Sequence, residues 1–106
     1  MRTEFIIIKT TFPNMEEAKK LAEILLKEKL AACIQFMPIE SSYSWHEKII
    51  NESEILLNIK TKKSLFDKIE KIIKKHHSYT IPQIVAIHII QGAEPYLNWI
   101  EQNLEK

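Results

Sequence analysis

Histidine and cysteine are the side chains of this sequence best suited to chemistry, because imidazole and thiolate groups bind zinc and copper. No pair of them has a metal-ligand spacing such as His-x-x-x-His or Cys-x-x-Cys. Without that spacing, the pattern favours a helix end for the adjacent histidines, inert packing for the cysteine, and a satisfied or edge position for His88. The candidates are His46, His76, His77, His88 and Cys33.

Nucleophilic catalysis and phosphoryl transfer find little support in the residue types. Asp67 is the only aspartate, and no Ser-His-acid or Cys-His pairing can be inferred from the sequence. Arg2 is the only arginine, so the chain lacks the guanidinium forks that usually bind phosphate or carboxylate groups. We therefore expect a protein that is not an enzyme.

Tyrosine and tryptophan are the remaining candidates for a ligand site. Their positions favour packing in the core and at interfaces, and an aromatic-lined cleft between subunits is the alternative. These residues are Tyr43, Trp45, Tyr79, Tyr96 and Trp99.

Composition bounds the class of protein. The 106 residues suit a single domain over 1–106, and 45% hydrophobic with 27% charged residues supply a core and a solvated surface. The net charge of +1 argues against a nucleic-acid partner, because such domains are usually visibly basic. One cysteine suits a reducing compartment. The apolar run at 5–8 is too short for a signal peptide or a membrane span, so we expect a cytoplasmic protein.

The first elements that must position these residues are a strand and a helix. Residues 5–8 are a β-branched run typical of a buried strand. Residues 15–29 carry apolar side chains at helical spacing and predict an amphipathic helix. Asn14 is the expected N-cap, with Glu17 completing a reciprocal capping box.

Residues 30–61 predict one long β-hairpin, around which the rest of the chain is organised. Pro38 indicates an edge strand or a bulge, and the bend is expected near 46–53. From 54 onward, Ile55, Leu57 and Ile59 alternate with Glu54, Leu56, Asn58 and Lys60, which indicates a strand buried on one face and exposed on the other. Tyr43 and Trp45 lie on one side of the hairpin end because side chains alternate along a strand. A small domain cannot cover so long a hairpin, so we expect a partner subunit there.

A second helix, a strand and a final helix complete the chain. Ser64 is the expected cap of the second helix, with Asp67 at the matching position. Residues 84–90 predict a buried strand, with His88 as the expected exception. Pro95 suits the first position of the last helix.

The order strand-helix-strand-strand-helix-strand, with an added C-terminal helix, predicts an α+β, ferredoxin-like domain with both long helices on one face. Ligands, the last helix or neighbouring subunits must then cover the opposite face. Many functions share this fold. RNA binding would need aromatic residues on the central strand, and residues 54–60 contain none.

Several segments of the sequence match a known family. The most specific is Leu-Ala-Ala-Cys-Ile at 30–34, followed by the Tyr-x-Trp pair of Tyr43 and Trp45. Further matching positions are Thr10, Thr11, Pro38, Ser42, Lys48, Ile49, 54–57, Lys60, Thr61, the loop 77–82, Gly92 and 96–99. On these residues the chain resembles the CutA family, the divalent-cation-tolerance proteins, over essentially its whole length.

The resemblance implies a homotrimer whose long hairpins pack around a threefold axis, with Tyr43 and Trp45 at the trimer interface. It also implies a role in tolerance of copper and other divalent metal ions. No cofactor is required, and a weakly bound Cu²⁺ or Zn²⁺ is the expected metal. Such a trimer is also similar to the PII signalling proteins. The alternative is therefore a PII-like regulatory or scaffolding trimer that binds a small molecule or a partner protein in its intersubunit clefts.

Two departures from the family pattern affect the expected site. Glu47 stands where the family often has glycine. The family loop commonly reads His-Pro-Tyr-Glu-hydrophobic-Pro-Glu, and here Thr80 and Gln83 replace its two carboxylates. A neutral amide is a weak ligand for Cu²⁺ or Zn²⁺. The resemblance leaves His77 as the candidate metal ligand, in an intersubunit cleft lined by Trp45, Lys60, Tyr79 and Gln83.

Overall fold

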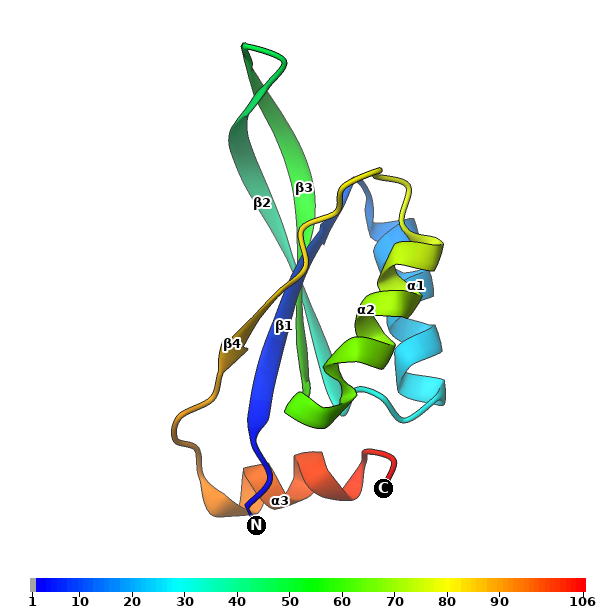
Figure 1. Ribbon diagram of the computed structural model, residues 1–106, viewed down its shortest axis with the longest axis vertical. Helices are drawn as coiled ribbons and strands as arrows, with labels where there is room; N and C mark the ends of the chain where they lie inside the picture. The colour runs from blue at the N-terminus through cyan, green and yellow to red at the C-terminus, as the bar shows by residue number, and fades with distance from the viewer. Residues whose placement is uncertain (1) are drawn as a thin grey trace.

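The computed structural model describes residues 2–106, which form a four-stranded antiparallel sheet in the order β2-β3-β1-β4. Helices α1 and α2 lie side by side on one face of the sheet (Figure 1). This arrangement confirms the α+β, ferredoxin-like fold. The elements are β1 (Phe5–Phe12), α1 (Met15–Lys27), β2 (Cys33–Trp45), β3 (Lys48–Lys62), a 3₁₀ turn (Lys63–Leu65), α2 (Phe66–His76), β4 (Val85–His88) and α3 (Glu94–Gln102).

The core lies between the sheet and the two long helices. Ile8 of β1 and Ile59 of β3 face each other across the ladder and are fully buried. Leu21 and Leu25 of α1 and Ile69 of α2 pack into the same cluster. Each strand and helix buries one side only. This one-sided burial explains the alternation along the strands and the apolar stripes along the helices, from which these elements were predicted.

The β2–β3 hairpin is confirmed, and its second strand is longer and its turn tighter than predicted. Its register runs without interruption from Cys33 opposite Lys60 to Trp45 opposite Lys48, so residues 33–62 contain no bulge at Pro38. Pro38 is tolerated because β2 is an edge strand. The bend expected over 46–53 is a two-residue turn at 46–47, and the paired strands project beyond the rest of the molecule (Figure 1).

The helix starts depart from the expected capping. Asn14 caps α1 by accepting a hydrogen bond from the Glu17 backbone N–H at 2.9 Å. The Glu17 carboxylate does not complete a capping box, because it accepts instead from the backbone N–H of Ser78 at 2.9 Å. The prediction of Ser64 as the cap of α2 is wrong. A 3₁₀ turn occupies Lys63–Leu65, so α2 begins at Phe66 without a side-chain cap.

The last strand was predicted to be buried over 84–90, and this prediction is wrong for the single chain. Strand β4 spans only Val85–His88 and all its residues are exposed, Ile87 by 50%. The reason is its position: β4 pairs with β1 on one side and forms the edge of the sheet on the other. An apolar sequence was sufficient to predict a strand but could not establish what covers it.

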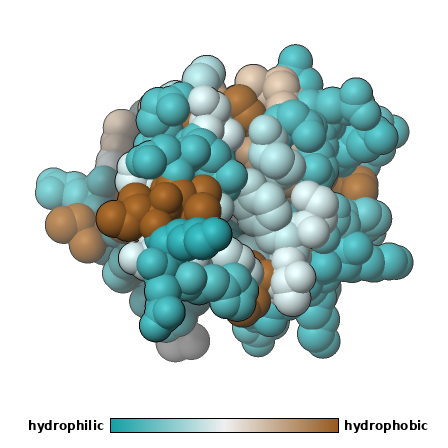
Figure 2. Space-filling model, turned by 90° about the horizontal axis from the view of Figure 1, so that it is seen from above, coloured by the Kyte–Doolittle hydropathy of each residue, from teal (hydrophilic) through white to brown (hydrophobic). Residues whose placement is uncertain are grey.

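Helix α3 lies across one end of the sheet and leaves the face opposite α1 and α2 open (Figure 1). Ile100 and Leu104 are buried, and Thr3 donates a hydrogen bond to Glu101 at 2.8 Å. The molecule seen from the hairpin end exposes patches of apolar surface among polar residues (Figure 2). No helix within residues 2–106 is long and apolar enough to span a bilayer.

Candidate ligand cleft beside the loop after α2

His77 begins the loop between α2 and β4, and both nitrogens of its ring form hydrogen bonds. The imidazole stacks on the buried ring of Phe12, with centroids 4.2 Å apart. Its Nε2 lies 2.6 Å from the carbonyl oxygen of Thr11, and its Nδ1 lies 3.0 Å from the backbone nitrogen of Tyr79. A carbonyl only accepts and a backbone N–H only donates, so Nε2 carries the proton and Nδ1 is the acceptor.

Tyr79 attaches the loop to the sheet. Its hydroxyl donates a hydrogen bond to the Glu54 carboxylate of β3 at 2.9 Å. Glu54 is only 7% exposed, and a buried polar group without a hydrogen-bond partner is costly. Burial, and then the hydrogen bond to Glu54, raise the pKa of Tyr79 well above its usual value. The phenol therefore stays protonated and keeps its role as a donor.

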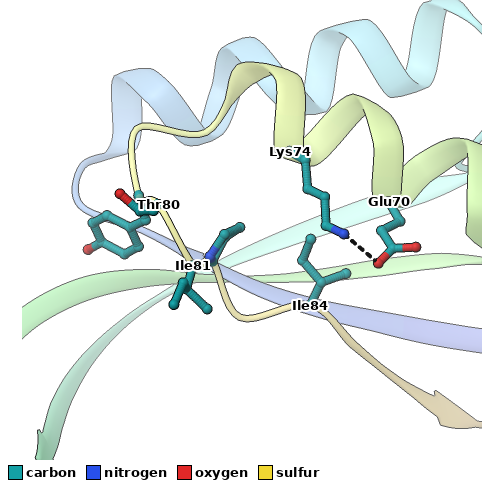
Figure 3. Close-up of a pocket in the computed structure, with 7 residues that line it drawn as sticks. Glu70, Lys74, Thr80, Ile81 and Ile84 are labelled. Atoms are coloured by element: carbon teal, nitrogen blue, oxygen red, sulfur yellow. Dashed lines mark ion pairs between the residues drawn. The ribbon is translucent and has the colours of Figure 1, made fainter. Parts of the chain in front are cut away.

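A hollow of about 480 Å³ lies between the loop and α2. Figure 3 shows Ile81 and Ile84 of the loop region on one side and the Lys74–Glu70 ion pair, 3.1 Å long, on the other. Thr80 lies at the end of the same hollow. The volume falls within the range of small-molecule pockets, and the lining combines apolar and charged groups.

The residues predicted to line one cleft do not meet within one chain. Trp45 sits at the hairpin tip opposite Lys48, and Lys60 lies twelve positions further along β3, about 40 Å away at the usual rise of a strand. Lys60 donates to the Tyr96 hydroxyl at 3.0 Å. His77 and Tyr79 do lie together, with their ring centroids 4.7 Å apart. A cleft that includes Trp45 would have to be formed by more than one subunit.

The carboxylates of Glu17 and Glu54 bind the loop after α2, and the sequence had predicted other roles for both. Glu17 was predicted to cap α1, and Glu54 was predicted on the solvent side of its strand. Their contacts to residues 78 and 79 join positions 61 and 25 residues apart, which periodicity along one element cannot reveal. Residues 2–106 contain no group of three His, Cys, Asp or Glu side chains that could hold a metal ion.

The fold defines a class of small ferredoxin-like proteins with one open sheet face, a projecting hairpin and a fixed loop after the second helix. The family model of the CutA1 divalent ion tolerance protein matches residues 6–103, and the chain belongs to this family.

Relatives and solved structures agree with this assignment. The chain is 40% identical to the chloroplastic protein CutA of Arabidopsis thaliana over 92% of its own length, but it spans only 54% of that protein. It is 37% identical to the divalent-cation tolerance protein CutA of Thermus thermophilus, covering 92% of this chain and 95% of the relative. The structure of the periplasmic divalent cation tolerance protein CutA from Archaeoglobus fulgidus superposes with a TM-score of 0.92 at 38% identity, covering 98% and 100% of the two chains.

Proposed function

We propose that this protein acts in tolerance of divalent cations, as a homotrimer without catalytic activity. The observation that carries the proposal is the family match over residues 6–103, which includes the hairpin and the loop after α2. The cytoplasm is the compartment we propose, because a single cysteine suits reducing conditions. The names of relatives include chloroplastic and periplasmic forms.

Exposed apolar surface supports the trimer. Ile87 and Val85 of β4 and Met37 of β2 are about half exposed, on the open face of the sheet. Tyr43 and Trp45 extend this surface to the hairpin end. Val85 and Ile87 lie at one edge of the sheet and Met37 at the other, with β1 and β3 between them. Obligate interfaces are large and apolar, and a subunit that covers the open face would bury both edges.

Divalent ions would be the cargo of such a trimer, and its residues suit weak binding. His77 has no free ring nitrogen, and Thr80 and Gln83 offer only neutral oxygens and nitrogens. Residues 2–106 lack a three-ligand cluster within one chain. Binding of Cu²⁺ or Zn²⁺ therefore requires ligands from more than one subunit, and the proposal includes no cofactor.

A regulatory or scaffolding trimer of the PII type is the second candidate. The hollow beside the loop favours it, since Ile81 is 77% exposed there and faces a region that also contains Lys74. A small molecule with an apolar part and polar groups that contact the Lys74–Glu70 ion pair would match this lining. The neutral loop residues Thr80 and Gln83 favour an organic ligand or a protein over a metal ion.

Native mass spectrometry with Cu²⁺ and then Zn²⁺ added stepwise tests these proposals. The expected species is a trimer that takes up a stoichiometric number of ions and loses them when it is diluted into monomers. A trimer that stays metal-free contradicts the cation proposal and favours the second candidate. A monomer at micromolar concentration contradicts the trimer itself.

A further inference from the structure

We infer that His77 is a positioning residue, which fixes the loop 77–83 through its Nε2–H tautomer, and that its imidazole does not bind a cation. This assignment differs from the metal-ligand role that the family resemblance implies. It concerns a single subunit and holds whether or not the trimer binds divalent ions.

The two hydrogen bonds occupy both ring nitrogens, so a metal ion would have to displace one of them. A metal-bound histidine usually donates its other ring N–H to a carbonyl or carboxylate, and the Thr11 carbonyl already has that relation to Nε2. The metal would then have to bind Nδ1, which accepts from the Tyr79 backbone N–H at 3.0 Å. Displacing this part-buried N–H leaves it without a partner and weakens metal affinity by about tenfold to a hundredfold.

Two carboxylates hold the same loop. Glu17 accepts from the Ser78 backbone N–H, and Glu54 accepts from the Tyr79 hydroxyl. Neither forms, with His77, a group of three side chains that could hold a metal ion within residues 2–106. Contacts to α1, β1 and β3 fix the wall of the hollow before any ligand arrives, which reduces the entropy cost of ligand binding.

Imidazole ¹⁵N NMR of the full chain tests the tautomer directly. The expected spectrum has a protonated Nε2 and a bare Nδ1 for His77, and neither signal moves when Zn²⁺ is added. The neighbouring His76, exposed at the end of α2, is the internal control for non-specific Zn²⁺ binding. A protonated Nδ1, or a Zn²⁺-dependent shift of the His77 Nδ1 signal alone, would overturn the inference.

Three variants separate the two hydrogen bonds. His77→Asn keeps an acceptor near Nδ1, His77→Gln keeps a donor near Nε2, and His77→Ala removes both. We expect hydrogen-exchange protection of the Tyr79 amide to fall by about fivefold to tenfold in the Ala and Gln variants and to be retained in the Asn variant. His76→Ala, the matched control, should leave this protection unchanged.

Metal uptake by the same variants distinguishes the inference from the proposed function. The side-chain amides of Asn and Gln are poor ligands for Cu²⁺ and Zn²⁺. If His77 is a metal ligand, all three variants should therefore lose bound ions equally. That loss, with Tyr79 protection unchanged, would overturn the inference. A wild-type trimer that takes up no ion contradicts the cation proposal instead, and it leaves the expected tautomer and exchange pattern as they are.

Discussion

Glu54 and Tyr79 illustrate what a sequence pattern omits at the scale of single residues. Alternation along residues 54–60 predicted that Glu54 faces solvent, yet it is buried and accepts from the Tyr79 hydroxyl. The alternation itself is correct, because Glu54 points away from α1 and α2. The pattern could not show that Tyr79 of the loop 77–83 contacts Glu54 on that face of β3. His77 and Tyr79 were predicted to share a cleft from the family resemblance, and their rings do lie together.

Tyr79→Phe should destabilise the protein by about 1 to 2 kcal/mol near neutral pH, because it leaves the buried Glu54 carboxylate without this donor. The pKa of Tyr79 is raised in the folded state, so the stability from its protonated form is complete below the ordinary tyrosine value of 10.0 and is lost as pH rises above it. Denaturant unfolding at neutral and alkaline pH measures both effects. A variant with the same alkaline loss of stability as the wild type would exclude Tyr79 as its source.

The long hairpin is the element that the sequence predicted best, and its turn is the part that it predicted least well. Pro38 and alternating side chains predicted the edge strand β2 and the part of β3 from residue 54 onward, whereas residues 48–53 of β3 were assigned to the bend. The turn residues His46 and Glu47 have φ values of 48° and 64°, a left-handed pair that usually requires Asn or Gly. Neither residue is a turn signal, so the polar segment 46–53 was predicted to be a wide bend.

Glu47→Gly should stabilise the protein by about 0.5 to 1 kcal/mol, because glycine adopts a φ of 64° without the steric cost that a Cβ brings. The matched control is Lys48→Gly, one position later and within strand β3, where glycine should destabilise. Chemical denaturation at one protein concentration compares the three chains. Equal stability of the wild type and the Glu47 variant would mean that the turn stores no strain.

On the scale of the whole molecule, the predictions that failed concern surfaces that a single chain leaves exposed, namely β4 and the hairpin end. The first long helix was predicted over 15–29 and spans Met15–Lys27, because its burial is internal to the chain. Strand β4 was predicted as buried because its residues are apolar, and Ile87 is nevertheless half exposed. Trp45 was predicted both at the trimer interface and in a cleft with Lys60, and about 40 Å separates these two residues in one subunit.

Trp45→Ala decides between those two positions for the hairpin end. If Trp45 is a buried centre of the proposed trimer interface, its truncation costs about 2 kcal/mol or more, and trimer dissociation begins at a concentration at least tenfold higher. Analytical ultracentrifugation over a dilution series measures this shift. Ile49→Ala is the matched control, because Ile49 lies near the same tip, is 76% exposed and points to the opposite face of the hairpin. If the Trp45 variant stays trimeric to the same dilution as the control, Trp45 is not an interface anchor and belongs to the ligand cleft.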